Sequence, residues 1–232
     1  MGIQPERSHH EQGPGQNEID FRYSTALNAA DNVITFKQVV STIAARNGLW
    51  ASFLPKPIAS EAGNGFHINY SLVRASDGSV PEDAVNLSFM AGILEHIPAM
   101  TAVLNPLADS YERLGREKAP DRVSWSPNNR SQLIRIPAAD VSHQRMELRS
   151  PDASANPYLA FALIMRAGLD GILRNLTPPA PCNQNLLQCT EEIRAQYPAL
   201  PRSLSEARHI MSESEFVKEA LPAHLFSAYA EQ

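Results

Sequence analysis

A mixed α+β fold is predicted by three features of the sequence. Residues 24–46 and 156–173 repeat apolar side chains at every third or fourth position, the spacing of an amphipathic helix. Several shorter segments alternate apolar and polar residues and end at Gly, Pro or Asn, as strands do. With 232 residues, of which 43% are hydrophobic, the chain can bury the core of one large domain or of a domain and a half.

The N-terminal part is predicted to begin with a hairpin. Two short strands are joined there by Gly13-Pro14-Gly15, a strong turn signal. A helix follows over 24–46, with Ser24 as the expected N-cap and Gly48 just past its end.

The middle of the chain combines predicted strands with one long helical region. Segments 49–57 and 65–74 are expected to be strands, and prolines end the first of them. Residues 82–114 are expected to be mostly helical, with breaks at Pro98 and at Asn105-Pro106.

The C-terminal part is predicted to supply short strands, a helix and a helical tail. The candidate strands are 122–126, 132–137 and 145–150. The helix over 156–173 carries Pro157 in its first turn, where the missing N–H has no helical partner to lose. A polar, proline-rich loop then leads to two or three short helices from Glu191 onward. We expect the strands to carry the chemistry and the helices to pack behind them.

Composition argues against several classes of protein. The net charge of −5 is unlike that of a nucleic-acid binder, which is usually basic. No apolar run approaches the roughly 20 residues that span a bilayer, and the N-terminus lacks the pattern of a signal peptide. Cys182 and Cys189 have neither zinc-ligand spacing nor a disulfide framework. We therefore expect a reduced, cytoplasmic protein with no nucleic-acid or membrane partner.

Glu11 and Glu18 form the first candidate site. They stand on either side of the predicted tight turn, so a hairpin brings their side chains together on one face. Two convergent carboxylates repel each other unless a cation lies between them, which indicates a divalent metal. The alternative is a pair of solvated glutamates on a surface hairpin.

Arginines accompany a third glutamate on the C-terminal strands. In an extended strand Glu147 shares a face with Arg145 and Arg149, and Arg130 and Arg135 lie near the preceding strand. Arginine is suited to bidentate capture of a carboxylate or phosphate. The set fits a metal ligand beside an anion clamp. It also fits a structural salt-bridge ladder, or ion pairs with the acidic helices.

The segment GNGFHINYS adds a histidine and two glycines. Gly63 and Gly65 allow the backbone to approach a ligand closely, and His67 follows on a predicted strand. A lone histidine is usually a structural residue, and it becomes a candidate ligand only if it faces the same cavity as the glutamates. Taken together, the carboxylates, the histidine and the arginines fit phosphoryl transfer between two anions.

Five blocks of sequence resemble the catalytic domain of the glutamine synthetase family, in its bacterial type I form. They are SHHEQGPGQNEIDFRY, FLPKP, GNGFHIN, NRSQLIRIP and RMELRSPDASANPYLAFA. The resemblance runs from Glu6 to the end of the chain. It implies that residues 1–232 form the C-terminal portion of that domain, a curved antiparallel sheet or half-barrel flanked by helices.

The resemblance also implies roles for individual residues. The expected ligands of two Mg²⁺ or Mn²⁺ ions are Glu11 and Glu18 for one, and His67 and Glu147 for the other. The expected ATP contacts are Glu6, Tyr23, Ser71, Arg135 and Arg145. The expected glutamate contacts are Gly63, Arg113 and Arg149. Arg130 and Glu117 are the expected catalytic residues, with Arg130 near the transferred phosphoryl group.

The reaction that the resemblance implies has two steps. The side-chain carboxylate of glutamate attacks ATP to give a γ-glutamyl phosphate, and ammonia then displaces the phosphate to form glutamine. Family members work as homo-dodecamers built from two hexameric rings, so a homo-oligomer is expected here.

Departures from the family pattern qualify this expectation. No β-grasp domain and no strand carrying a Glu-x-Glu pair precede Glu6, so the chain alone is expected to be inactive or weakly active. The loop LGREK carries Lys118 where the family's flap has a glutamate that serves ammonium, and Glu117 is displaced. A ligase that uses another amine and a non-catalytic fragment or pseudoenzyme are therefore alternatives. Leu187 stands where a regulatory tyrosine is often adenylylated, so that control is not expected.

Overall fold

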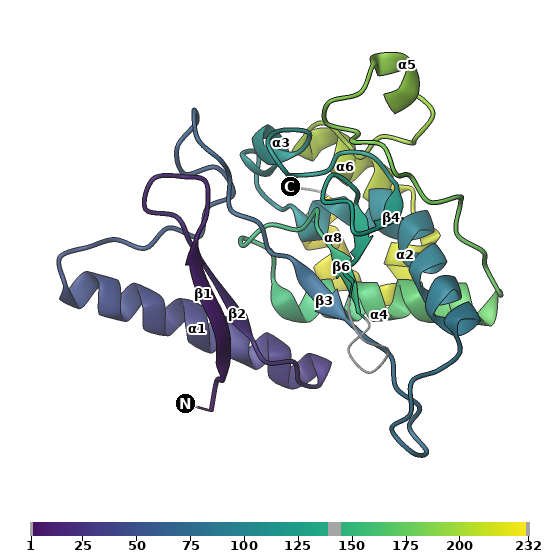
Figure 1. The fold of residues 1–232 in the computed structure, drawn as a ribbon, viewed down its shortest axis with the longest axis horizontal. Helices are drawn as coiled ribbons and strands as arrows, with labels where there is room; N and C mark the ends of the chain where they lie inside the picture. Colours follow the sequence, from purple (N-terminus) through teal and green to yellow (C-terminus); the bar gives the residue numbers. More distant parts are fainter. Residues whose placement is uncertain (1, 139–144, 231–232) are drawn as a thin grey trace.

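The computed structural model describes residues 2–138 and 145–230. A hairpin and a long helix lie on one side of the molecule, and a small sheet surrounded by helices lies on the other (Figure 1). The mixed α+β class predicted from the sequence is confirmed.

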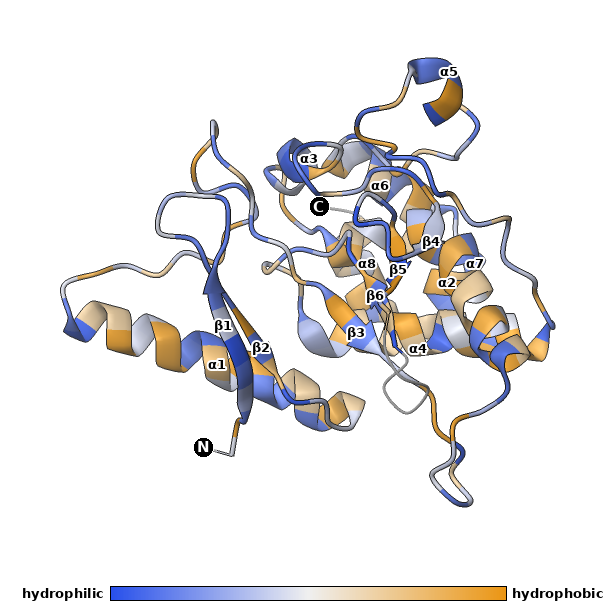
Figure 2. Cartoon of the chain, viewed as in Figure 1, coloured by the Kyte–Doolittle hydropathy of each residue, from blue (hydrophilic) through white to orange (hydrophobic). Residues whose placement is uncertain are grey.

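The N-terminal hairpin forms as predicted. Strands β1 (Pro5–His10) and β2 (Asn17–Phe21) pair in antiparallel fashion, with a register shift between Pro5 and Arg7. The turn is closed by a hydrogen bond from the Gln16 N–H to the Gly13 carbonyl, and Gly15 adopts a φ of 68°. Because β1 is exposed along its whole length and strongly hydrophilic (Figure 2), its side chains remain available for polar chemistry.

Helix α1 (Ala26–Arg46) supports the hairpin. Its N-cap is Thr25, so the prediction of Ser24 was wrong by one residue, and Gly48 follows its end with a φ of 69°. The rings of Phe21 in β2 and Phe36 in α1 stack edge to face at 5.0 Å. The Tyr158 hydroxyl donates to the Asp31 carboxylate at 2.5 Å, which connects α1 to the helix Pro157–Leu173.

The central sheet has four strands in the order β3-β6-β5-β4. They are β3 (Ile68–Tyr70), β6 (Met146–Leu148), β5 (Ile134–Ile136) and β4 (Trp125–Pro127). All neighbouring strands are antiparallel except β4 and β5, which are parallel. The sheet brings the GNGFHIN, NRSQLIRIP and RMELRS segments side by side.

Residues 49–57 do not form the predicted strand. Pro55 and Pro57 have no N–H to give to a ladder. The Asn64 side chain donates to the carbonyls of Ser52 and Leu54, so this backbone is satisfied by a side chain rather than by a neighbouring strand.

Helices α2 (Asp83–Leu104) and α4 (Pro157–Leu173) form the core behind the sheet. They cross so closely that a Cβ on Gly92 would collide with the Ala167 carbonyl, and one on Gly171 with the Ser88 carbonyl. The predicted break at Pro98 is wrong, because α2 continues through it. Burial of nearly every residue from Phe89 to Leu104 outweighs the hydrogen bond lost at the proline.

The apolar length of α2 was also missed at the sequence level. This helix of 22 residues is long and apolar enough to cross a membrane, which contradicts the expectation that no run approaches that length. However, 72% of its most apolar window is buried inside the protein. Its composition is therefore that of a core helix (Figure 2).

The remaining helices are short, and the last three of them pack against α2. They are α3 (Ser110–Arg113), α5 (Glu191–Arg194), α6 (Leu204–Ser212), α7 (Glu215–Ala220) and α8 (Ala223–Ala230). The tail thus holds four described helices where two or three were predicted. Ser203 and Ser214 cap α6 and α7 by accepting hydrogen bonds from backbone N–H groups.

Candidate functional site

The buried carboxylate of Glu147 lies at the centre of the sheet. It is on β6, between β3 and β5, and its side chain is 8% exposed. Arg135, opposite it on β5, brings its Nε to 2.8 Å from Oε2, and the Arg149 Nη1 donates to Oε1 at 2.9 Å. The His67 Nδ1 lies 3.3 Å from the same Oε1. The strands therefore gather one acid, two guanidiniums and one imidazole.

His67 is held in its neutral form. Burial lowers its pKa well below the usual value, and the positive charges of Arg149 and Arg113 lower it further. A neutral imidazole keeps a lone pair on one ring nitrogen, which is the form that ligates a metal.

Arg113 is buried without an acidic partner. Its guanidinium donates to the Ser150 carbonyl at 2.7 Å and to the Arg149 carbonyl at 3.1 Å, and no described residue forms an ion pair with it. Burial lowers its pKa to about 10, so it still carries its charge at neutral pH. The charges of Asp152 and Glu117 also act on Arg113, but neither carboxylate forms an ion pair with it, so its guanidinium can attract an anion.

Two glycines make room for this arginine. A Cβ on Gly63 would lie 2.5 Å from the Pro55 carbonyl and 3.0 Å from the Arg113 Cγ. A Cβ on Gly65 would lie 2.9 Å from both the Arg113 Nη2 and the His67 Nε2. The close approach predicted for these glycines is thus an approach to protein side chains of the site.

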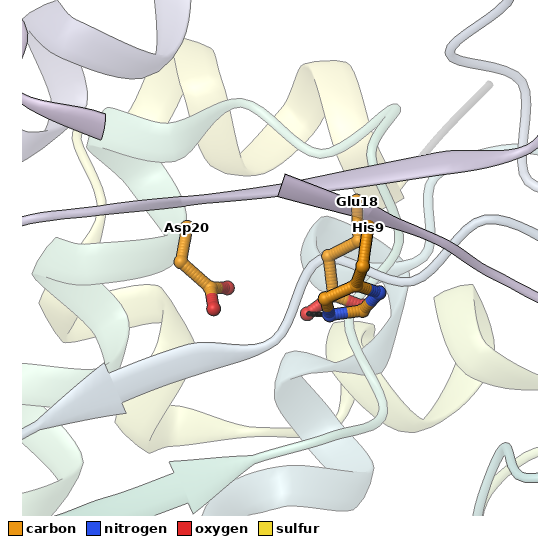
Figure 3. Close-up of side chains that lie close together, drawn as sticks. All are labelled: His9, Glu18 and Asp20. Carbon is orange, nitrogen blue, oxygen red and sulfur yellow. Dashed lines mark ion pairs between the residues drawn. The ribbon is translucent and has the colours of Figure 1, made fainter. Parts of the chain in front are cut away.

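The N-terminal hairpin carries a second acidic cluster. His9 lies between the two predicted ligands, with Nδ1 3.7 Å from Glu11 and Nε2 3.9 Å from Glu18. Ligand atoms of His9, Glu18 and Asp20 lie within 4.8 Å of one another, and all three side chains leave the hairpin on one side (Figure 3). The structure therefore brings Glu11 and Glu18 to one place, as the turn predicted.

Mutual repulsion is evident within this cluster. The pKa of Glu18 is raised by burial, then by the charges of Asp20 and Glu11. Sequence reasoning assigned no ligand role to His9 or Asp20. Two signals were present: His9 pairs with Glu18 across a hairpin, and Asp20 lies two residues after Glu18 on an extended strand.

Lys118 connects the two clusters. Its Nζ lies 3.5 Å from Oε2 of Glu11, and its carbonyl accepts a hydrogen bond from the Arg149 Nη2 at 3.5 Å. On the other side of the turn, the Gln16 Nε2 donates to the Gly63 carbonyl at 3.0 Å and to the Asn64 Oδ1 at 2.9 Å. The hairpin is thus attached to both loops that border His67 and Glu147.

Glu117, in the same loop as Lys118, is directed at another lysine. Its Oε1 lies 3.6 Å from the Nζ of Lys56, a side chain that is only 4% exposed. Glu117 adopts a φ of 49°, a left-handed conformation that the short loop imposes. The loop therefore places one carboxylate on a buried cation and one ammonium on Glu11.

Other predicted residues lie at the edge of this arrangement. Arg145 is exposed, and its Nε donates to the Asn69 Oδ1 at 3.1 Å rather than to Glu147. The Arg130 side chain is exposed, while its carbonyl accepts from the Arg149 Nε. Within the described chain, the exposed side chains of Glu6, Tyr23 and Ser71 have no hydrogen-bond partner.

Comparison with known proteins gives this arrangement a family. The sequence profile of the glutamine synthetase catalytic domain matches residues 1–232. The chain belongs to the glutamine synthetase family. It is 47% identical to the glutamine synthetase of Clostridium saccharobutylicum and 48% identical to that of Methanosarcina mazei, each over 99% of this chain and 54% of the relative. The chain thus spans about half the length of the curated relatives it matches.

The fold comparison agrees. A solved GmaS–ADP complex superposes with a TM-score of 0.89 at 34% identity, covering 99% of this chain and 55% of that one. A structure of GmaS without ligand gives a TM-score of 0.87. The resemblance to the glutamine synthetase catalytic domain is therefore confirmed in both sequence and fold.

The donor groups suit the divalent metals that the glutamine synthetase family uses. Oε2 of Glu147 contacts the Arg135 Nε at 2.8 Å without forming a hydrogen bond among the described residues, and His67 is neutral, so both side chains can offer a lone pair to a cation. On the hairpin, the carboxylates of Glu11, Glu18 and Asp20 lie together beside His9 and Lys118. Hard cations prefer such oxygen-rich sets.

Removing the Glu147 carboxylate is expected to destabilise the fold strongly. In Glu147→Ala, Arg135 and Arg149 would be left as buried, unpaired charges, which costs about 3 kcal/mol in the free energy of unfolding. Urea denaturation followed by circular dichroism measures this. Glu112→Ala is the matched control, because the exposed Glu112–Arg116 pair is worth less than about 1 kcal/mol. Equal losses in the two variants would contradict the central role of Glu147.

Lys118 is expected to compete with a metal for Glu11. Lys118→Ala removes the competing ammonium and should tighten Mn²⁺ binding about five-fold, the equivalent of an exposed ion pair near 1 kcal/mol. Lys118→Arg keeps the charge and should bind Mn²⁺ as the unaltered chain does. Electron paramagnetic resonance of free Mn²⁺ gives the affinities. An unchanged affinity in Lys118→Ala would show that the ion pair does not oppose the metal.

Proposed function

We propose that this chain carries the phosphoryl-transfer site of an ATP-dependent ligase that joins glutamate to an amine through a γ-glutamyl phosphate. The observation that carries the proposal is the shared cluster of Glu147, neutral His67 and the arginines 113, 135 and 149. Transfer of a phosphoryl group to a carboxylate joins two anions, and such a site can neutralise both. Membership of the glutamine synthetase family supports the same reaction.

Two divalent cations, Mg²⁺ or Mn²⁺, would be shared between the clusters. Glu11 and Glu18 would hold one ion, and His67 and Glu147 the other. Bound there, the ions would neutralise and polarise the phosphates of ATP. The protein itself orients these ligands: the Gln16 hydrogen bonds fix the hairpin against the loop that precedes His67, and the arginines fix Glu147.

The remaining predicted residues would bind the substrates. Arg113 supports this most directly, since it is a buried cation without an acidic partner in the described chain, and with Arg149 and Gly63 it would hold glutamate. The proposed ATP contacts are Glu6, Tyr23, Ser71, Arg135 and Arg145, with Arg130 near the transferred group. The related GmaS structure contains ADP, which is consistent with a nucleotide at this site.

The amine of the second step has two candidates. The names of the curated relatives favour ammonia. The ion pairs of the loop favour a different amine, because Glu117 is committed to Lys56 and Glu11 faces Lys118. Among the described residues of this loop, no carboxylate without an ion-pair partner remains to attract ammonium. The second candidate is therefore an amine that the protein recognises through contacts with its carbon skeleton.

Isotope scrambling tests the first step without assuming the amine. ATP is labelled with an oxygen isotope at the β,γ-bridging position. In the presence of Mg²⁺ and glutamate the label should move to the non-bridging β positions. Reversible formation of γ-glutamyl phosphate releases ADP, whose β-phosphate can then rotate before ATP re-forms. Arg113→Met should reduce the rate by 100-fold or more, about the loss of one charge-stabilising group. ADP release with a panel of amines then separates the two candidates. Scrambling that does not depend on glutamate, or ATP that fails to bind with Mg²⁺, would overturn the proposal.

We also propose a homo-oligomer, as the family implies. Exposed apolar side chains support it: Leu27, Ile34 and Ile43 on α1 are 45–65% exposed, and Trp50 beyond the helix is 80% exposed. Burying such side chains favours association. Light scattering should give a mass above that of one chain, and Leu27→Ser with Trp50→Ser should lower it. A monodisperse monomer would contradict this proposal.

A further inference from the structure

An open pocket of about 460 Å³ lies outside the candidate site described above. It is formed where the loop after α3 meets the segment that contains α5 and leads to α6. The lining residues are Tyr111, Leu114, Gly115, Arg116, Asp121, Arg122, Glu191, Arg194, Leu200, Pro201 and Arg202. Its size is within the range of small-molecule sites.

The lining carries an excess of positive charge. Four arginines face two acids, Asp121 and Glu191, so the difference is 4 − 2, or +2. Arg194 pairs with Asp121 at 2.6 Å, and Arg122 pairs with Glu191 at 3.2 Å. Both acids are therefore already engaged. Arg116 has only an exposed partner, Glu112, at 3.3 Å.

Several donors of the pocket have no hydrogen-bond partner among the described residues. Arg122 is only 7% exposed, yet its Nε makes no hydrogen bond and lies 3.9 Å from the Asp121 carboxylate. The buried Nε of Arg194 makes no hydrogen bond either and lies 3.7 Å from the Glu191 carboxylate. The backbone N–H of Arg202 donates to the Glu206 carboxylate, and its guanidinium has no partner among the described residues. The two Nε groups are closed off from solvent, so the guanidiniums that a ligand can reach are those of the exposed Arg116 and Arg202.

The rest of the lining is apolar. Leu114, Leu200 and Pro201 form a wall beside the arginines, and Tyr111 adds an aromatic ring. A bare inorganic ion would leave this wall without a contact. We propose that the pocket binds a small dianion with an apolar body, such as a phosphate monoester or a dicarboxylate. Arginine forks suit both anions because each presents paired oxygens.

The pocket also shares a loop with the candidate ligase site. Gly115 and Arg116 line the pocket, and the next two residues, Glu117 and Lys118, pair with Lys56 and Glu11 on the other side. A Cβ on Gly115 would lie 2.9 Å from the Asp121 carboxylate, so loop and pocket are in close contact. A ligand that engages Arg116 therefore acts on the backbone that holds Lys118 against Glu11, which makes this an effector site. Only this coupling rests on the proposed function.

Binding is tested by calorimetry without ATP, glutamate or metal, so the result does not depend on the ligase proposal. The probes are phenyl phosphate, glutarate and inorganic phosphate. Phenyl phosphate or glutarate should bind more tightly than inorganic phosphate, and the tighter of the two identifies the anion. Arg202→Ala and Arg116→Ala should each weaken binding about ten-fold, the loss of one charge-assisted hydrogen bond. Both side chains are exposed, so these variants should still fold.

Arg46→Ala is the matched control, because Arg46 is an exposed arginine at the end of α1 and does not line the pocket. It should bind the probes within two-fold of the unaltered chain. Equal affinities in all variants, or no preference over inorganic phosphate, would overturn the site. The preferred probe should also change Mn²⁺ affinity at Glu11 by at least three-fold, and Lys118→Ala should abolish that change. Binding with no change in Mn²⁺ affinity would overturn the effector role.

Discussion

The pairing of Glu147 with Arg135 and Arg149 is the interaction on which the rest of the site depends. A buried carboxylate is tolerated only when charges and hydrogen bonds surround it, and here two neighbouring strand positions supply them. Arg149 in turn offers its carbonyl to Arg113, and the arginines keep His67 neutral. Burial and the arginines thus set the charge state of the histidine, while Glu147, through Arg149, helps to fix the position of Arg113.

The hairpin follows the opposite electrostatic rule. Around Glu147 the protein supplies more positive than negative charge, whereas the carboxylates of Glu11, Glu18 and Asp20 gather on the hairpin beside His9 and Lys118. Burial raises the pKa of Glu18, and the charges of Asp20 and Glu11 raise it further. A cation is thus favoured on the hairpin, and the arginines around Glu147 favour an anion beside the cation that Glu147 and His67 would hold. The Gln16 hydrogen bonds hold the two surfaces together. Metal-bound ATP, which has both kinds of charge, suits this division.

Local signals in the sequence were enough to predict the hairpin, α1 and α4, since each depends on nearby residues. The roles of the charged residues came from the family resemblance and stay predictions. These local signals failed where contacts between residues distant in sequence determine the local structure. Pro98 does not break α2 because the surrounding core buries that helix, and 49–57 forms no strand because Asn64 satisfies its carbonyls. The pocket joins Arg122 to Arg194 and Arg202, and no local pattern links residues so far apart in sequence.

The loop around Lys118 shows how two sites share one short segment. Lys118 is paired with Glu11 in the structure, and a divalent ion on Glu11 would repel that ammonium. The backbone carbonyl of Lys118 also accepts a hydrogen bond from Arg149, and the Gly115 N–H donates to the Ala119 carbonyl. These bonds couple the positions of the residues in the loop. Displacement of Lys118 therefore strains the pairing of Glu117 with Lys56 and the position of Arg116. A metal bound at Glu11 and an anion bound at Arg116 would therefore affect each other's affinity through the contacts of this loop.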